Sequence, residues 1–165
     1  MSTPALTAEE LIAWNDATSH QWRTFVTENP TVLAVQCDIY KAETVGQLLQ
    51  HIVAAELRYA ERLAELPVSD YAAIPYATSD DIYATHDRAL SILRTLLADP
   101  TYDWNAQLEF NTLTQGRRRS SRRSILFHAM LHGIRHYAQL TTLVRQAGFS
   151  PKMALDYLLM DSQPI

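Results

Sequence analysis

The sequence is poor in cysteine and glycine, and both shortages exclude whole classes of site. The single cysteine, Cys37, rules out an intramolecular disulfide and any Cys-x-x-Cys site. The four glycines lie far apart, at Gly46, Gly116, Gly133 and Gly148. They cannot form a Gly-rich phosphate loop, so the nucleotide-binding fingerprints of the Rossmann and P-loop folds are absent. The Gly-x-Ser-x-Gly motif of a serine nucleophile elbow is absent as well.

Long apolar runs and a strong charge of either sign are also lacking. No apolar run approaches the roughly 20 residues of a membrane-spanning helix. Residues 1–10 lack the basic and apolar regions of a signal peptide. We therefore expect a cytoplasmic protein that does not bind the membrane. The formal net charge of -4 makes general attraction to nucleic acid unexpected.

What remains is the composition of an ordinary globular protein. Hydrophobic residues make up 47% and charged residues 19% of the 165 residues, which is unlike a disordered chain. A chain of this length suits one hydrophobic core. We therefore expect a single domain over residues 1–165, in which Cys37 is a small buried apolar residue.

Prolines and helix-capping residues divide the chain into helical segments. Glu10 follows Thr7 by three residues, and Gln47 follows Thr44 by three, as in a capping box at a helix start. Apolar residues at helical spacing follow each start. The pattern predicts four long helices and a short fifth one: from Thr7 to before Pro30, from Thr44 to before Pro67, over about Ser79–Ala98, over about Ser121–Ala147 and over about Pro151–Met160.

Two segments have no helical pattern. Residues 31–43 predict a loop with a short extended part, and residues 102–113 predict a strand or hairpin arm. The basic run Arg117–Arg123 contains five arginines at the start of the fourth helix. A solvated loop is one interpretation of this run, and a clamp for an anion is the other. Four long amphipathic helices in a chain of this size indicate an all-α four-helix bundle.

Three of the six histidines lie in the fourth predicted helix, as His128-x3-His132-x3-His136. Residues four apart share a helix face, so two neighbouring members can direct their imidazoles at one metal ion. His128 and His136 lie about 12 Å apart along the helix axis. One ion can therefore bind His128 with His132, or His132 with His136, but not all three.

The helix faces favour the second pair. His132 and His136 share a stripe with apolar residues, whereas His128 lies on a more polar stripe. Gly133 beside the pair leaves room for close helix packing or for a ligand. A third ligand must come from another helix, and His51 on the second helix is the candidate. Three neutral imidazoles with an open position are typical of a catalytic metal site, and separate structural histidines are the alternative.

Two segments of the sequence resemble the signatures of the DinB/YfiT-like superfamily. The first is Leu48–Glu56, with the sequence LLQHIVAAE, and the second is His128–Leu140, with the sequence HAMLHGIRHYAQL. The second segment continues into Leu143–Phe149, LVRQAGF, which resembles the way this family ends the same helix. The resemblance in spacing extends from the first helix to about Asp156.

The resemblance implies a DinB-like four-helix bundle in the order up-down-down-up, here with a short extra C-terminal helix. It also implies one divalent metal ion held by three histidines. Matching the motifs residue by residue assigns these ligands to His51, His132 and His136. Nickel, zinc and iron all suit imidazole ligands. Members of the family are often homodimers, so a homodimer is expected.

The resemblance leaves several functions open. Some relatives transfer low-molecular-weight thiols, and others resemble amide hydrolases. The leading hypothesis is a metal-dependent thiol S-transferase, in which the ion activates a thiol cosubstrate that reacts with a small-molecule substrate. A metal-dependent hydrolase is one alternative. The other is a non-catalytic, stress-related binding or dimerisation module with a structural metal.

Several further residues bear on the site. His86 is expected to be a hydrogen-bonded core residue, with a role beside the metal as the alternative. Glu56 points about 140° away from the histidine of its helix, so a structural role is expected rather than a ligand role. Gln139 is either a hydrogen-bond partner near the site or a surface residue. Tyr59 and Tyr137 are expected in the core, with pocket lining as the alternative.

Overall fold

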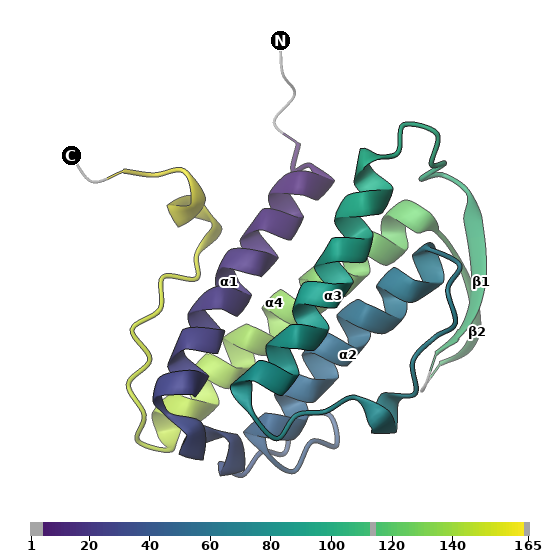
Figure 1. The fold of residues 1–165 in the computed structure, drawn as a ribbon. Coiled ribbons are helices and arrows are strands. Elements are labelled where there is room, and N and C mark those ends of the chain that lie inside the picture. The colour runs from purple at the N-terminus through teal and green to yellow at the C-terminus, as the bar shows by residue number, and fades with distance from the viewer. Residues whose placement is uncertain (1–4, 113–114, 164–165) are drawn as a thin grey trace.

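The computed structural model describes residues 5–112 and 115–163, most of which are helical. Four long helices pack against one another, and a two-stranded sheet lies beside them (Figure 1). The elements are α1 (Ala8–Glu28), α2 (Val45–Leu63), α3 (Ser79–Ala98), β1 (Gln107–Thr112), β2 (Gly116–Ser121) and α4 (Arg122–Gln146). Short 3-10 helices cover Pro30–Ala34, Tyr71–Ala73 and Tyr157–Met160. No described helix is both long enough and apolar enough to cross a membrane.

The helix starts are determined by local side chains. At α1 the Thr7 hydroxyl accepts a hydrogen bond from the Glu10 amide, and the Glu10 carboxylate accepts one from the Thr7 amide. Thr78 and Asp81 repeat this arrangement at α3. The Thr44 hydroxyl accepts a bond from the first turn of α2. These bonds satisfy amides that a helix start leaves without partners, and they confirm the predicted starts at Thr7 and Thr44.

The end of α4 agrees with the prediction, whereas the end of α2 differs from it. α4 ends beside Gly148, which adopts a left-handed φ of 91° that glycine tolerates without strain. α2 ends at Leu63, earlier than predicted. Glu65 adopts a left-handed φ of 56°, and the amide of Leu66 bonds back to the carbonyl of Glu61. This turn closes the helix before the proline that was expected to end it.

The short fifth helix predicted over Pro151–Met160 is wrong. Its first six residues are irregular, and a 3-10 turn follows them. Side chains of α1 bond to this backbone instead: the Trp14 indole donates to the carbonyl of Leu155, and the Gln21 amide bonds both backbone groups of Ala154. Because its polar groups find partners on α1, the segment lies extended along that helix (Figure 1).

The segment before α4 forms a β-hairpin. β1 pairs with β2 in an antiparallel register that places Thr112 opposite Gly116. The strand predicted within residues 102–113 is therefore confirmed as β1, while Leu113 itself lies outside the described residues. The hairpin packs on α2 through an edge-to-face contact between the rings of Phe110 and Tyr59, whose centroids lie 6.0 Å apart.

The arginines at 117–119 of the basic run Arg117–Arg123 are exposed, as the interpretation as a solvated loop expects, but the run is a strand and the start of α4 rather than a loop. Two of its arginines pair with Glu109 across the hairpin. Arg122 pairs with Glu65 at the end of α2. Cross-strand charge pairs of this kind stabilise a two-stranded sheet. The run of arginines by itself does not show that a carboxylate lies on the other strand.

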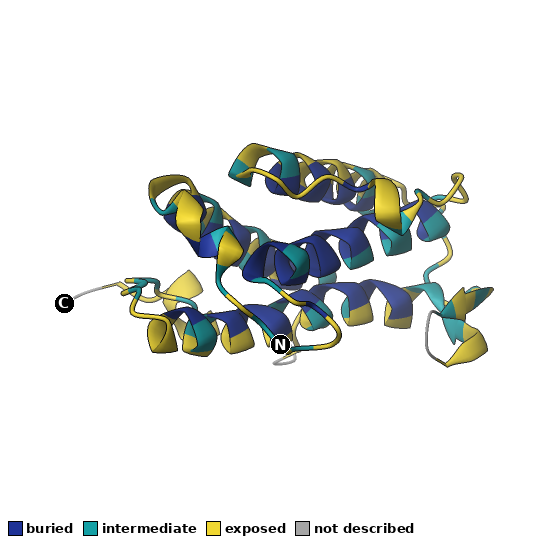
Figure 2. Ribbon diagram, turned by 90° about the horizontal axis from the view of Figure 1, so that it is seen from below, coloured by how far each residue is buried: buried dark blue, intermediate teal, exposed yellow. Residues whose placement is uncertain are grey.

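The buried residues lie on the sides of the helices that face one another (Figure 2). One cluster surrounds Trp22, whose ring stacks on that of Tyr137 at a centroid distance of 5.8 Å. The other lies farther along α2, around Leu57 and Leu126. Tyr137 is thus a core residue, as expected. Cys37 is half-buried rather than buried, because the loop before α2 carries it over the edge of the first cluster.

α2 and α4 lie against each other. α2 contacts α3 and α4, and α1 contacts the same two helices. On its other side α4 is tied to α1, where Asn15 donates to the carbonyl of Met130 and the hydroxyls of Ser19 and Tyr137 share a hydrogen bond. The contact between α2 and α4 is where the predicted metal ligands lie.

Candidate metal centre

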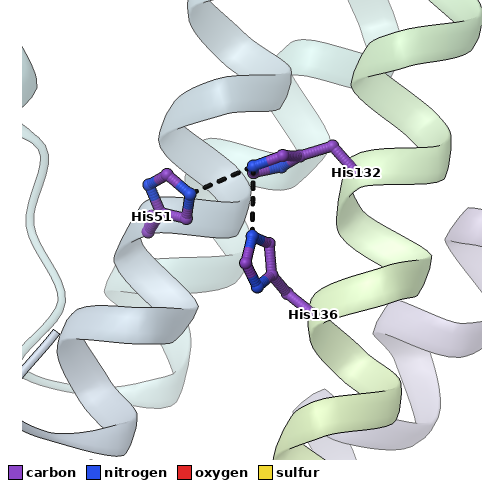
Figure 3. A group of neighbouring side chains, drawn as sticks. All are labelled: His51, His132 and His136. Carbon is purple, nitrogen blue, oxygen red and sulfur yellow. Dashed lines mark hydrogen bonds between the residues drawn. The ribbon is translucent and has the colours of Figure 1, made fainter. Parts of the chain in front are cut away.

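Three histidines from two helices meet between α2 and α4 (Figure 3). His51 comes from α2, and His132 and His136 come from α4. Nε2 of His132 lies 3.0 Å from Nε2 of His51 and 3.2 Å from Nε2 of His136. One ring nitrogen of each residue lies within 4.8 Å of those of the other two. The structure therefore brings together the three residues that the sequence singles out.

The close approach of the helices at this point depends on Gly133. A Cβ atom at that position would lie 2.9 Å from Nδ2 of Asn15 and 3.0 Å from Oε1 of Glu56. Both distances are shorter than ordinary van der Waals contact, so with a side chain at that position either these two side-chain ends or α4 itself would have to move. Gly133 therefore serves close helix packing, and this packing brings its neighbour His132 within reach of His51.

Burial keeps the three imidazoles neutral. It lowers the pKa of His51 to about 4 and that of His132 to about 2. The neighbouring histidines and Arg135 add to the effect, because their positive charges would repel a further proton. Burial lowers the pKa of His136 as well. Near neutral pH each ring can therefore offer a nitrogen lone pair, which a protonated imidazole cannot.

Gln139 determines which nitrogen of His136 faces the other two histidines. Its Oε1 lies 2.7 Å from Nδ1 of His136. An amide oxygen only accepts hydrogen bonds, so Nδ1 carries the ring proton and Nε2 carries the lone pair. Gln139 is thus a hydrogen-bond partner at the site, one of the two alternatives for it. The guanidinium of Arg135 donates to the same Nε2 at 3.3 Å.

Tyr40 covers one face of His51. The two rings stack with their centroids 4.4 Å apart and their planes at 28°. Tyr40 and the following Lys41 have φ values of 52° and 65°, in the left-handed region that residues with a side chain rarely adopt. This turn holds the ring of Tyr40 over the site. Sequence reasoning missed Tyr40, because its loop has no periodic pattern.

The donor set fits a divalent metal ion. Imidazole nitrogens bind zinc at roughly 2.0–2.1 Å, so two of them at a tetrahedral angle lie about 3.4 Å apart. The separations of 3.0 and 3.2 Å from His132 are close to that spacing. With a lone pair on Nε2 of His136, a lone pair on Nε2 of His132 would face it, and a cation between the two would relieve this repulsion. Three ligands would leave a coordination position open.

Two other histidines lie outside this group. His128 is exposed, and its ring meets that of Tyr59 edge to face at 5.3 Å. His86 is buried, with Nδ1 2.7 Å from a carboxylate oxygen of Glu56 and Nε2 3.4 Å from one of Asp16. His86 is therefore the hydrogen-bonded core residue that was expected, and Glu56 has a structural role.

A pocket of about 270 Å³ opens beside His51 and His132. Tyr59 lines it, so this half-buried ring has the position that was the alternative to the core. Arg58 and Arg62 of α2 also line the pocket, and sequence reasoning missed both. Their spacing would have found them, because residues seven and eleven positions after His51 lie on the same face of a helix.

Comparison with known proteins agrees with this arrangement. The sequence profile of the DinB family matches residues 1–164 of the chain. No curated protein matches the chain in a sequence comparison. The family match covers nearly the whole sequence, so the chain belongs to the DinB family and the resemblance seen in its two histidine segments is confirmed.

Proposed function

We propose that this member of the DinB family binds one divalent metal ion through Nε2 of His51, His132 and His136. The observation that carries the proposal is the convergence of three neutral ring nitrogens within 4.8 Å of one another. Gln139 supports it by holding His136 in the tautomer that a metal requires. Nickel, zinc and iron are the proposed ions, because imidazole is a suitable ligand for each.

A bound ion would supply Lewis acidity, which lowers the pKa of a thiol or water in the open position and yields a nucleophile near neutral pH. The chain itself shapes the space beside that position. The rings of Tyr40 and Tyr71 flank His51, with centroids 4.4 and 6.5 Å from its ring. Both tyrosines line the pocket and restrict the access of water to the histidines.

We propose thiol S-transfer as the reaction. The sulfur of a thiol cosubstrate would lose its proton to solvent and form a carbon–sulfur bond with an electrophilic small molecule. The electron pair displaced from that carbon would leave with a leaving group, or in an addition to a double bond it would take up a proton from solvent. The described lining of the pocket contains no carboxylate that would act as a general base. This favours a thiol, whose ordinary pKa of about 8.5 requires far less lowering than that of water. Metal-dependent hydrolysis is the second candidate, because the imidazole of His128 lines the pocket and can take part in proton transfer. Burial and the charge of Arg135 lower its pKa, which favours the neutral ring that accepts a proton.

Elemental analysis of untagged protein tests the metal proposal. We expect about one metal ion per chain in the wild type and none in the double variant His132→Ala/His136→Ala. His128→Ala is the matched control, because it removes an imidazole one turn earlier on the same helix and outside the group of three. The proposal is wrong if the wild type holds no metal and takes up neither nickel, zinc nor iron on titration.

Turnover by metal-loaded protein separates the two reactions. Consumption of an electrophile that requires an added thiol would support the transferase. Release of product without a thiol would instead support the hydrolase. Loss of either activity in His132→Ala, with retention in the wild type, would assign it to the histidine site. Repeating the assay with His128→Ala shows whether the exposed imidazole takes part in proton transfer.

A non-catalytic module with a structural metal makes a different prediction. A metal that holds a fold together contributes much of its stability, so a chelator would unfold such a protein. Here two apolar clusters join the helices without any contribution from the histidines. We expect the metal-free protein to stay folded by circular dichroism and to lose only the ion.

We further propose the up-down-down-up order for the four helices. His51 lies beside His136 and Tyr59 beside His128, so residue numbers rise along α2 as they fall along α4. Along the contacts between α1 and α4, the residue numbers of both helices rise together. This supports the same direction for α1 and α4, and therefore opposite directions for α1 and α2.

We also propose a homodimer, supported by exposed apolar side chains such as Leu158, which is 73% exposed. Light scattering after size exclusion tests the dimer.

A further inference from the structure

The pocket beside the histidines is strongly basic. Three arginines line it: Arg58 and Arg62 from α2, and Arg135 from α4. Six of the chain's twelve arginines form ion pairs with carboxylates, but within the described residues none of these three does. The described lining also contains no aspartate or glutamate. The described lining therefore supplies no carboxylate to pair with these three guanidiniums.

The two arginines of α2 are held in place by neutral partners. Arg58 donates through Nη1 to the carbonyl of Ser69. Arg62 donates through Nη1 to the carbonyl of Arg58 at 3.2 Å, and its guanidinium lies over the ring of Tyr59, 5.3 Å from the centroid. A guanidinium has five N–H donors, so each side chain is positioned while most of its donors stay available.

This arrangement is unfavourable without an anion. Arg58 and Arg62 are one helical turn apart, and like charges at this spacing destabilise a helix. Burial lowers the pKa of Arg62, and the charge of Arg58 lowers it further. The charge of Glu61 offsets part of this lowering, but that carboxylate is already paired with Arg88 and hydrogen-bonded to Ser69. A negative group between the two guanidiniums would remove the repulsion and satisfy the free donors.

The pocket connects these arginines with the histidines. His51 and Arg58 lie on the same face of α2, about 10 Å apart along the helix axis. Between them the pocket is lined by Ala55, whose small side chain leaves the space open. Asn111 of β1 also lines the pocket. The volume of about 270 Å³ is near the lower end of the range for ligand pockets, which suits a small molecule.

We propose that Arg58, Arg62 and Arg135 form a binding subsite for a small organic acid. Its carboxylate binds at the guanidiniums, whose planar forks match that group, and the rest of the molecule extends toward the histidines. The direction toward a metal rests on the proposed function, whereas binding of the anion does not require the metal. The substrate, or the thiol cosubstrate, is then a carboxylic acid rather than a neutral molecule.

Titration of the metal-free protein with succinate tests the subsite. The Nε–Hε signals of the arginines report the binding by NMR, and succinamide serves as a ligand of similar size without charge. We expect saturable shifts with succinate and none with succinamide. In Arg58→Gln and in Arg62→Gln the Kd for succinate rises at least about fivefold, because a charge-assisted hydrogen bond is lost. Arg145→Gln, at an exposed arginine near the end of α4, leaves it unchanged.

Two results would overturn the proposal. One is an unchanged succinate Kd in both α2 variants. The other is succinate binding that requires added metal and is lost in His132→Ala, because the carboxylate would then bind the ion. Arg135→Gln changes an exposed position on α4 and provides a third variant if those on α2 fail to fold. The succinate titration uses metal-free protein, so its result does not depend on whether the chain binds a metal. Either proposal can therefore be wrong while the other holds.

Discussion

Nδ1 of His136 and Oε1 of Gln139 are joined by a hydrogen bond of 2.7 Å. The bond links a buried ring to an exposed amide one turn later on α4. It leaves Nε2 of His136 as the nitrogen that faces His132, 3.2 Å away. Partners of this kind orient a ligand and make it more basic, so Gln139 affects a metal site that it does not itself contact.

Removal of this bond should weaken metal binding without changing the fold. We expect Gln139→Ala to reduce metal affinity about ten- to a hundredfold, as is usual when a ligand loses its orienting partner. Competition with a chromophoric chelator measures the affinity. Gln146→Ala, at the last residue of the same helix, is the control and should bind like the wild type. Equal affinities for the two variants would contradict the role of Gln139.

The lowered pKa values of the histidines predict an unusual pH dependence of metal binding. Protons compete with a metal only when the pH approaches the pKa of the ligands. Because the pKa of His51 is about 4 and that of His132 about 2, we expect the affinity to change little from pH 8 to pH 6. It should fall as the pH nears about 4, where His51 takes up a proton.

Calorimetry in non-coordinating buffers measures this dependence, and circular dichroism at each pH confirms that the chain is folded. A synthetic peptide of residues 128–136 provides the comparison, because its solvated histidines have the ordinary pKa of about 6.5. Its affinity should decline from that pH downward. A protein that loses affinity together with the peptide would show that burial does not keep its histidines neutral.

The raised pKa of His86 predicts that the folded protein becomes less stable as the pH rises. This direction is opposite to that of metal binding, which weakens as the pH falls. Burial by itself lowers the pKa of His86, but the charges and hydrogen bonds of Glu56 and Asp16 outweigh it and raise the pKa to about 9. Between the ordinary value of 6.5 and about 9, the folded chain then holds more protons than the unfolded chain. This contribution to stability is complete below pH 6.5 and is lost as the pH rises through about 9.

Urea denaturation of metal-free protein at several pH values tests this. We expect the free energy of unfolding to decrease from pH 6.5 to pH 9 in the wild type. Glu56→Gln removes the main charge that stabilises protonated His86, so its curve should be lower and flatter over that range. His20→Asn changes an exposed histidine of α1 and should follow the wild type. Parallel curves for the wild type and Glu56→Gln would refute the assignment.

The helix starts and the histidine pair were predictable because they depend on local spacing. Thr7 and Thr44 cap their helices through groups three residues away. His132 and His136 share a face because one helical turn separates them. His51 required more than spacing, since only the packing of α2 on α4 brings it to the pair. Its place on the second helix made His51 a candidate, and the resemblance to a family supported that assignment.

The errors arose where distant partners outweighed local signals. The C-terminal segment has a good helix start in Ser150 and Pro151, but its backbone bonds to Trp14 and Gln21 of α1 instead. The arginine run has no helical or apolar pattern, and its pairing with Glu109 appears only once β1 lies beside β2. In both cases the deciding contact is made with residues on another helix or strand, so the pattern of the segment itself does not show it.

Gly133 allows a last prediction, in which two effects oppose each other. Alanine is favoured over glycine by about 1 kcal/mol in an open helix. Here the added Cβ would lie 2.9 Å from Nδ2 of Asn15 and 3.0 Å from Oε1 of Glu56. Neither neighbour moves freely, because Asn15 bonds to the carbonyl of Met130 and Glu56 bonds to His86. We therefore expect overpacking to exceed the gain in helix propensity.

The expected result for Gly133→Ala is a net loss of about 1–3 kcal/mol in the free energy of unfolding of the metal-free protein. The same displacement of α4 would move His132 relative to His51, so metal affinity should fall as well. Urea denaturation and chelator competition measure the two effects. Ala138→Gly, at an exposed position of α4, measures the helix propensity alone. If Gly133→Ala were instead more stable, with unchanged metal affinity, the close approach at this glycine would not matter for the site.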